Sequence, residues 1–338
     1  MQPDLATRLG PLSLRHPVVC GSGEHVSSLE QLRAAVDAGA AAVVAKSANE
    51  SDAGRRQADA TQWVFVDAER REVESSAAAS MLNRSGLVQK PWAEWLETIA
   101  EADNHARERE SWVAASIIPG DFDRLGELAR DVERAGIRWL ELNLSAPHAG
   151  EAAPGAIERP GDAARAGELV AQVRRAVSIP VSVKLAAEQH DVVAVAAEAR
   201  RAGADVIVLM GRHMGFLPDL ETRRPVLGSF GGYSGPWALP LTLRWVAKTR
   251  LALGADVPLV ATNGVRGGAD VARCLLAGAA AVQIASSVIA EGFGAITRTV
   301  QELSACLEAQ GVNARDIVGE AAEHSMTYEE AALPRSRA

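Results

Sequence analysis

Two lysines close otherwise apolar stretches of the sequence. Lys46 ends the run Ala-Val-Val-Ala-Lys, and Lys184 ends the run Val-Ser-Val-Lys. An ammonium group in an apolar surrounding is costly unless it is paired with a carboxylate or touches an anionic ligand. A structural ion pair is the ordinary explanation for one such residue. Two of them in equivalent positions favour a bound cofactor that carries negative charge.

A third stretch, residues 139–148, reads Trp-Leu-Glu-Leu-Asn-Leu-Ser-Ala-Pro-His. Its alternating first half predicts a buried strand, and Asn143, Ser145 and His148 stand where that strand opens into a loop. Buried strands rarely carry this many hydrogen-bonding groups without a use for them. A capped strand end before a surface loop would give the same pattern, so the meaning of this stretch depends on the other strand ends.

Polar residues and glycines follow other apolar runs in the same way. These strand ends are Gly21-Ser22-Gly23, Lys46-Ser47, Gly211-Arg212-His213, Thr262-Asn263-Gly264 and Ser286-Ser287. Open backbone amides at a helix start bind phosphate, so the last two favour a phosphate site, which the Gly-Gly-Tyr-Ser-Gly run (231–235) could extend. Each glycine cluster alone is more often a simple turn. The sequence contains no metal-ligand spacing and no Ser-His-Asp nucleophile motif.

Eight short apolar runs alternate with longer amphipathic stretches along the chain. The predicted strands are Pro17–Gly21, Ala42–Lys46, Trp112–Ile117, Trp139–Leu144, Pro180–Leu185, Val206–Met210, Pro258–Thr262 and Ala281–Ala285. The predicted helices are Ser28–Ala38, Pro91–Ala106, Asp121–Ala135, Asp162–Val177, Val192–Ala202, Pro240–Leu253 and Gly268–Ala277. This alternation predicts an α/β protein with a (β/α)8 TIM barrel, whose ligands bind at the carboxyl ends of the strands. A doubly wound sheet is the competitor, but no GxGxxG motif follows the first strand.

We expect residues 1–338 to form a single domain with two interruptions. Residues 62–80 predict a small hairpin insertion, in which Trp63–Val66 and Glu72–Val73 are joined by a turn. Met214–Pro236 predicts a long loop after the sixth strand, and loops of that length in a compact barrel are usually lids or ligand walls. We expect residues 333–338 to be a disordered tail.

The composition excludes several classes of protein. A formal net charge of −8 gives no basic surface for nucleic acid or for anionic membranes. Cys20, Cys274 and Cys306 are far apart in the sequence, which argues against iron–sulfur clusters, structural zinc and disulfides and suits a reducing cytoplasm. No apolar run approaches the ~20 residues of a membrane span. The first residues lack the basic and apolar regions of a signal peptide.

Taken together, the chain from Leu5 to Gly311 resembles the FMN-dependent dihydroorotate dehydrogenases and the FMN domain of dihydropyrimidine dehydrogenase. The matching segments occur in order: Leu9–Leu12, His16–Gly23, Val44–Ser47, Leu82–Leu87, Glu141–His148, Val183–Leu185, Gly231–Gly235, Pro258–Gly264 and Gly278–Gln283. The Pro147-His148 pair and the Gly231–Gly235 run lean toward the dihydropyrimidine branch.

This resemblance implies an FMN site and a substrate site. The implied cofactor-binding residues are Gly21, Ser22, Gly23, Lys46, Ser47, Asn143, Lys184, Gly232, Asn263, Gly264, Ser286 and Ser287. Among them, Lys184 would lie at the N1–C2 edge of the flavin, where a cation stabilises the anionic reduced ring. The implied substrate-binding residues are Asn83, Gly86, Leu87, Asn143 and His148, and the implied catalytic residues are His148, Lys46 and Ser145.

The chain departs from the family on the substrate side. Ala146 stands where the family has its Cys or Ser base, and alanine cannot take a proton. Gly211 and His148 stand where dihydroorotate enzymes have asparagine, and Asn263 replaces a usual glycine. His148, which titrates near neutrality, is our candidate acid/base, although a ligand-binding or loop histidine would look the same. His25, Arg84, Lys90, Arg212 and His213 could line the mouth and suit an anionic or carbonyl-bearing substrate.

We therefore predict an FMN-dependent oxidoreductase acting on CH–CH bonds. It would transfer hydride between flavin N5 and a small cyclic amide- or carbonyl-bearing substrate other than dihydroorotate. The alternatives are a redox-neutral FMN enzyme that catalyses an elimination or rearrangement, and a flavin-binding protein without catalysis. The expected partners are a small-molecule substrate, a second copy of the chain in a homodimer and a possible separate electron acceptor, with no nucleic acid, membrane or metal.

Overall fold

The computed structural model describes residues 2–56, 61–145, 162–188 and 191–332, and at its centre eight parallel strands close into a barrel. In barrel order the strands are β3 (Val18–Cys20), β4 (Ala42–Val44), β7 (Trp112–Ile117), β8 (Leu140–Asn143), β9 (Val181–Lys184), β10 (Val206–Leu209), β13 (Leu259–Thr262) and β14 (Ala281–Ile284). Each of the eight predicted strands is present, so the prediction of a TIM barrel is confirmed. The predicted tail, residues 333–338, lies outside the described residues.

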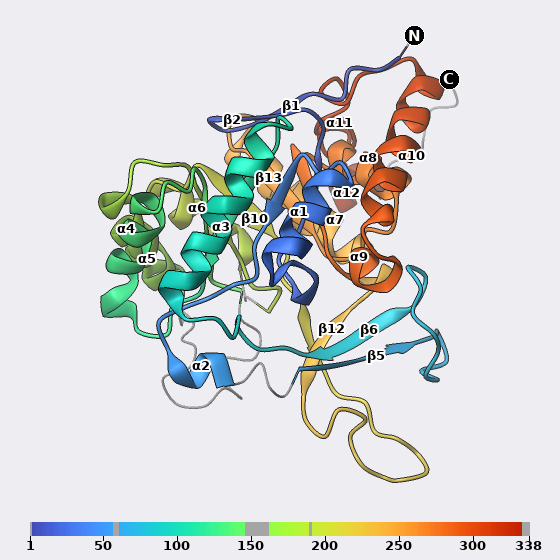
Figure 1. Ribbon diagram of the computed structural model, residues 1–338. Helices are drawn as coiled ribbons and strands as arrows, with labels where there is room; N and C mark the ends of the chain where they lie inside the picture. Colours follow the sequence, from blue (N-terminus) through green and yellow to red (C-terminus); the bar gives the residue numbers. More distant parts are fainter. Residues whose placement is uncertain (1, 57–60, 146–161, 189–190, 333–338) are drawn as a thin grey trace.

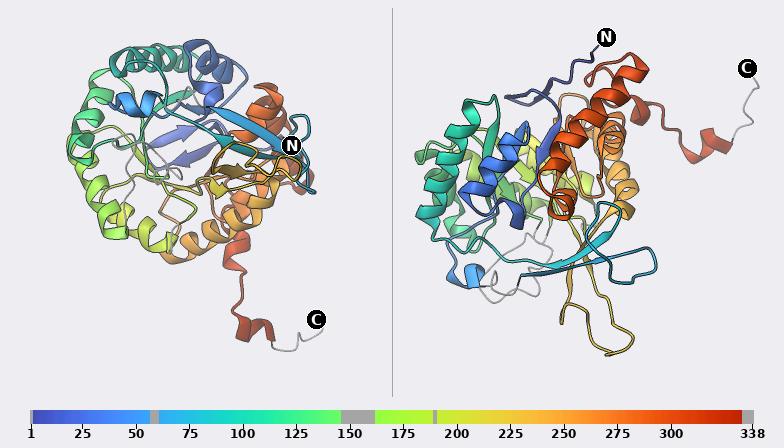
Figure 2. Two further views of the ribbon diagram at one scale, coloured as in Figure 1. Left: turned by 90° about the horizontal axis from the view of Figure 1, so that it is seen from below. Right: turned by 45° about the vertical axis from the view of Figure 1, so that its right-hand side comes forward.

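Helices surround the barrel as a ring (Figure 2, left). They are α1 (Leu29–Asp37), α3 (Trp92–Arg107), α4 (Leu125–Arg134), α5 (Ala163–Ala176), α6 (Val192–Arg201), α7 (Leu239–Leu253), α8 (Gly268–Leu276) and α10 (Gly294–Gln310). Side chains of Ser28, Asp162 and Asp191 cap the first turns of α1, α5 and α6. The Ala-Gly pairs end helices as predicted; Gly278, for example, has a φ of +111° directly after α8.

Shorter elements complete the chain. They are the helices α2 (Asp52–Arg56), α9 (Ser286–Glu291), α11 (Glu320–Glu323) and α12 (Tyr328–Ala332), and the single turns η1 (Glu24–Val26), η3 (Phe122–Arg124) and η5 (Pro236–Ala238). Strands β1 (Thr7–Leu9) and β2 (Leu12–Leu14) form a hairpin. Its leucines pack with Val19, Ala42 and Val206 inside the barrel, so the amino-terminal end of the barrel is closed by apolar side chains.

The two interruptions of the barrel pattern meet in one antiparallel sheet. Its order is β11 (His213–Gly215), β12 (Gly231–Ser234), β6 (Ser80–Arg84) and β5 (Gln62–Val66). We expected β5 to pair with residues 72–73 in a hairpin. That pairing is present next to the turn, where Val66 and Glu72 form an antiparallel bridge and the Val73 N–H donates to the Phe65 carbonyl at 3.0 Å. Along its whole length, however, β5 pairs with β6. This insertion sheet lies across the end of the barrel that is formed by the carboxyl ends of the strands (Figure 1).

A buried ion pair ties α3 to the barrel wall. Asp103, which is 1% exposed, accepts two hydrogen bonds of 2.7 Å from Arg138. The same carboxylate accepts a bond of 3.0 Å from the backbone N–H of Val113 in β7. Removing one partner of a buried pair leaves the other charge without compensation, which is more costly than the pair itself is stabilising.

We therefore expect Asp103→Ala to lower the free energy of unfolding by about 3 kcal/mol, measured by chemical denaturation. The matched control is Glu101→Ala on the same helix. Glu101 pairs with Arg33 at 2.8 Å, but both side chains are well exposed, so its loss should change stability by less than ~1 kcal/mol. Equal effects of the two substitutions would contradict the assigned role of Asp103.

Candidate active site

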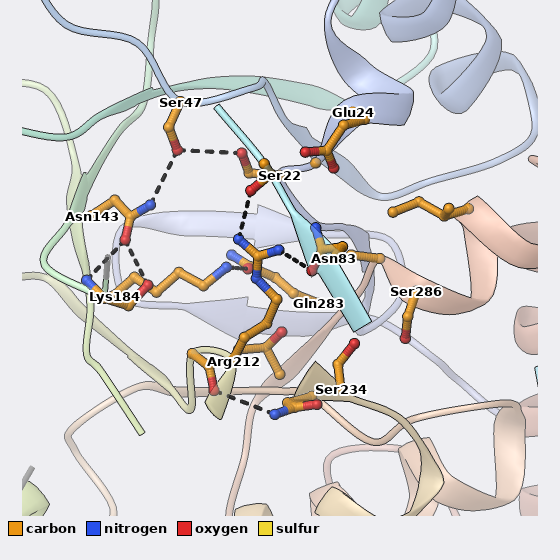
Figure 3. Close-up of a pocket in the computed structure, with 18 of the residues that line it drawn as sticks. Ser22, Glu24, Ser47, Asn83, Asn143, Lys184, Arg212, Ser234, Gln283 and Ser286 are labelled. Carbon is orange, nitrogen blue, oxygen red and sulfur yellow. Dashed lines mark hydrogen bonds between the residues drawn. The ribbon is translucent and has the colours of Figure 1, made fainter. Parts of the chain in front are cut away.

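A cavity of about 1010 Å³, counted with its open mouth, lies between the barrel strands and the insertion sheet (Figure 3). Strand ends supply Ser22, Lys46, Asn143, Lys184 and Gln283, as expected for a TIM barrel. The insertion sheet supplies its outer wall, which includes Met81, Asn83 and Ser234. Because the two interruptions of the sequence build one sheet, they act together as a wall of the site.

Lys184 lies at the inner end of the cavity and is part of a buried polar row. Its Nζ donates to Gln283 Oε1 at 3.1 Å, and Gln283 Nε2 donates to Glu141 Oε2 at 2.7 Å. Burial lowers the pKa of Lys184, the attraction of Glu141 raises it, and the nearby charges of Arg212 and Lys46 lower it further. An anion in the cavity would stabilise the charged form of this lysine.

Lys46 forms an ion pair with Glu24, and the distance between Nζ and Oε1 is 3.0 Å. Burial raises the pKa of Glu24, but the charges of Lys46 and Arg212 together outweigh that effect, so its pKa falls from 4.5 to about 2. Both residues line the cavity. The pair therefore presents a fixed carboxylate and a fixed ammonium group to whatever is bound.

Arg212 reaches across the cavity from the end of β10 to the insertion sheet (Figure 3). It donates to Asn83 Oδ1 and, at 3.0 Å, to Ser85 Oγ. A guanidinium group can only donate, so the Asn83 oxygen must face Arg212 and its nitrogen must face away. A Cβ atom at Gly232 would lie 3.0 Å from Asn83 Oδ1 and 3.2 Å from Arg212 Cδ. Glycine at that position therefore makes room for this contact.

Asn143 is oriented by the same kind of argument. Its Oδ1 accepts from the backbone N–H of Ser145 at 2.9 Å and from the Ser145 hydroxyl at 2.6 Å. A backbone N–H can only donate, so the amide nitrogen of Asn143 must point the other way, where it donates to Ser47 Oγ at 3.1 Å. Its amide is thus held in one orientation at the cavity wall.

Two buried polar atoms on the glycine-rich side of the cavity are unsatisfied. Ser234 Oγ and Asn263 Oδ1 have no hydrogen-bond partner among the described residues. Leaving such a group unpaired costs ~1–3 kcal/mol. Asn263 has a φ of +78°, which glycine adopts freely and asparagine tolerates, and Gly264 follows with +95°. A Cβ at Gly264 would lie 2.3 Å from the Leu239 nitrogen, so the close approach requires glycine.

Most of the residues predicted from the sequence meet in this cavity. The predicted residues that line it are Ser22, Gly23, Lys46, Ser47, Asn83, Gly86, Leu87, Asn143, Ser145, Lys184, Asn263, Gly264 and Ser286. Gly21, Gly232 and Ser287 do not line it; the Ser287 hydroxyl donates instead to the Val265 carbonyl at 2.7 Å. Ala146 and His148 lie outside the described residues.

Of the five additional candidates for the mouth, Arg212 lines the cavity and the other four do not. His25 packs beside Cys20, with 3.4 Å between Nε2 and Sγ, and burial lowers its pKa to about 4. Lys90 pairs with Glu94 at 2.8 Å, and Arg84 donates to the Leu227 carbonyl at 2.7 Å. His213 packs against Trp237 in a tilted arrangement, with 5.3 Å between ring centroids and 52° between ring planes.

Sequence reasoning missed Glu24, Ser85 and Gln283, which also line the cavity, whereas Ser234 lies in the run 231–235 that was predicted to extend the phosphate site. Gln283 could have been found, because it is a polar residue inside the apolar strand Ala-Val-Gln-Ile, as Lys184 is in its own strand. Glu24 and Ser85 gave no such signal, since both stand in polar loops. The described residues contain no group of three or more metal-ligating side chains and no helix long and apolar enough to cross a bilayer.

The family model for dihydroorotate dehydrogenase matches residues 5–307. The chain is 30% identical over 313 residues to "Dihydroorotate dehydrogenase B (NAD(+)), catalytic subunit" of Pyrococcus furiosus, covering 91% of this chain and 95% of that protein. It is 35% identical over 288 residues to the protein of the same name from Methanopyrus kandleri, with 83% and 84% covered. "Dihydroorotate dehydrogenase A (fumarate)" of Lactobacillus helveticus is 32% identical over 211 residues, with 62% and 67% covered.

The depressed pKa of Glu24 gives a testable pH dependence. The Glu24–Lys46 pair stabilises the fold fully above about pH 4.5, and this contribution is lost as the pH falls toward 2. We expect the stability difference between wild type and Glu24→Gln to shrink by up to ~3 kcal/mol between pH 5 and pH 2, measured by denaturant unfolding. The exposed Glu101→Gln serves as control. A difference that does not change with pH would contradict the assigned ion pair.

Proposed function

The chain belongs to the dihydroorotate dehydrogenase family, whose members are FMN-dependent oxidoreductases acting on CH–CH bonds, and we propose that it oxidises or reduces a small cyclic substrate other than dihydroorotate. The observation that carries the FMN-dependent activity is the buried Lys184 in a cavity with unpaired polar atoms on its glycine-rich side. The proposed change of substrate rests on Arg212, Gly211 and Ala146 on the substrate side.

The described residues fit FMN. The open backbone at Asn263 and Gly264, with Ser286 beside it, would hold the phosphate, and Ser22 and Gly23 would lie along the ring. Ser234 Oγ and Asn263 Oδ1 would gain the partners that they lack. Bound FMN supplies the hydride-accepting and hydride-donating chemistry. Lys184 would stabilise negative charge at that end of the cavity.

On the substrate side, Asn83 and Asn143 would orient the substrate, and Lys46 would balance its charge, together with backbone at Gly86 and Leu87. The space available to the substrate differs from that of a site with an asparagine after strand six. A Cβ at Gly211 would lie 2.7 Å from the Ser145 Cβ, so Ser145 packs directly against the backbone there. Arg212 already donates a hydrogen bond to the side-chain oxygen of Asn83. Both features support a changed substrate that is amide- or carbonyl-bearing.

Alanine at position 146 cannot take or give a proton, so proton transfer needs another residue of the site. We propose His148 as one candidate acid/base and substrate-binding residue, since it follows two residues later in the sequence and titrates near neutrality. Ser145 lines the cavity, but its hydroxyl is bonded to Asn143 at 2.6 Å, which favours a positioning role. The loss of the usual base also motivates a second candidate function, a redox-neutral elimination or rearrangement that needs bound FMN without an electron acceptor.

We further propose that the chain works with partners. Two relatives are named as catalytic subunits, which supports a separate electron-transfer subunit. A homodimer and a cytoplasmic location are proposed by analogy with the family and from the three free, well-separated cysteines.

The test is the absorbance spectrum of the purified protein, followed by anaerobic mixing with dihydroorotate or dihydrouracil. We expect flavin absorbance bands that chemical reduction by dithionite bleaches but that neither substrate bleaches within minutes. The dithionite reaction is the internal control, because it shows that the flavin can be reduced. Protein without flavin bands after reconstitution with FMN would contradict the cofactor assignment. Rapid bleaching by dihydroorotate would contradict the proposed change of substrate.

A further inference from the structure

A row of hydroxyl groups runs from the cavity into the barrel interior and ends at a buried carboxylate. The Ser22 and Ser47 hydroxyl oxygens are 3.4 Å apart, and Ser47 and Ser116 are 2.8 Å apart. Ser116 Oγ lies 3.4 Å from Glu141 Oε1. Ser22 and Ser47 line the cavity, whereas Ser116 and Glu141 are 1% and 0% exposed. Figure 3 shows the upper part of this row, at Ser22 and Ser47.

The direction of each hydroxyl hydrogen follows from the acceptors. At the buried end, the Ser116 hydroxyl donates to Glu141 Oε1. Ser116 has one hydrogen, so the contact with Ser47 requires Ser47 to donate to Ser116. Ser47 already accepts from Asn143 Nδ2 at 3.1 Å, and its second lone pair can accept only from Ser22. All three hydroxyl hydrogens therefore point from the cavity toward Glu141.

We propose that Ser22, Ser47 and Ser116 conduct the substrate proton to Glu141, which takes the place of the base that Ala146 cannot provide. This inference rests on the proposed oxidoreductase function. It assigns the acid/base role to Glu141, deep in the barrel, and the relay to three serines that come from β3, β4 and β7 or the residues directly after them. The carboxylate need not touch the substrate, because protons pass along aligned hydroxyl groups.

The substrate C–H bond breaks, and its electron pair becomes the new C=C bond as the neighbouring carbon loses hydride. FMN, the oxidant of this family, would supply the acceptance of that hydride when bound. The released proton joins Ser22 Oγ, while the hydrogen of Ser22 passes to Ser47, that of Ser47 to Ser116 and that of Ser116 to Glu141. Glu141 gains one proton, and each serine hydroxyl again carries one hydrogen. Reduction of a double bond would use the same path in reverse.

Satisfying the hydrogen-bonding needs of the buried Glu141 carboxylate would not by itself require three hydroxyl groups in a row. Glu141 Oε2 already accepts from Gln283 at 2.7 Å, and one hydroxyl would satisfy Oε1. The row instead continues through a second and third hydroxyl until it reaches the cavity. Its orientation is fixed at the cavity end by Asn143 and at the buried end by Glu141. Continuity and uniform direction are what a proton path needs.

The decisive variant is Ser116→Ala, because Ser116 does not line the cavity. Flavin in the loaded protein is reduced with dithionite, and its reoxidation by 2-cyclohexen-1-one, a small cyclic carbonyl compound, is followed by stopped flow. The α-carbon of this acceptor needs a proton. We expect Ser116→Ala to slow reoxidation by about 10²-fold or more, the usual contribution of a positioned acid/base. Its thermal midpoint and oxidised flavin spectrum should stay close to those of wild type.

Ser182→Ala is the matched control. Ser182 is also a fully buried serine in a barrel strand and lies beside Glu141 in the neighbouring strand. Its hydroxyl accepts from Trp139 and donates to the Leu140 carbonyl, so its hydrogen bonds do not join the row. We expect its reoxidation rate to equal that of wild type. Glu141→Gln should be slowed like Ser116→Ala, since the glutamine amide would donate to Ser116 and reverse the row.

Equal rates in Ser116→Ala, Ser182→Ala and wild type would overturn the proposal. A large loss in His148→Gln with no loss in Ser116→Ala would assign the proton to His148 instead. Should Ser116→Ala fail to fold, the solvent isotope effect of the wild-type protein decides. If several protons move in the same step, a plot of the reoxidation rate against the fraction of deuterium in the solvent is curved. A straight line would contradict the relay. No reoxidation by 2-cyclohexen-1-one would contradict the proposed reduction of a cyclic carbonyl-bearing substrate, on which the relay depends.

Discussion

Lysine and arginine side chains can only donate hydrogen bonds, and the polar interior of this barrel is ordered by that constraint. Lys184 fixes the amide of Gln283, which in turn points its nitrogen at Glu141. Arg212 fixes the amide of Asn83. Since amide orientation determines which atoms face the cavity, these two buried cations specify the hydrogen-bonding pattern at Gln283 and Asn83.

The same cations explain why the cavity is suited to an anionic cofactor. Burial lowers the pKa of Lys184, and the nearby charges of Arg212 and Lys46 lower it further. Glu24 offsets part of this repulsion, and its own pKa falls to about 2 in consequence. Bringing negative charge into such a cavity relieves the remaining repulsion, so cofactor binding and the protonation of Lys184 stabilise each other.

The sequence was sufficient for the barrel because each strand and helix follows a local pattern that packing reinforces. It was also sufficient for Lys46, Asn143 and Lys184, since polar residues at the ends of apolar strands are conspicuous. The insertion sheet was only half predicted. The partner of β5 is β6, which is followed in the sheet by β12 from a segment 150 residues away in the sequence, and no local pattern specifies such pairing. Glu24 and Arg212 acquire their roles only through contacts across the cavity.

The central claim is that Lys184 stabilises negative charge on FMN bound in this cavity. Potentiometric titration of the bound flavin in wild type, Lys184→Met and the exposed control Lys248→Met tests it most directly. The account predicts a more negative midpoint potential in Lys184→Met, because the reduced, anionic flavin loses its cation, and a wild-type potential in Lys248→Met. Identical potentials in all three proteins would contradict it.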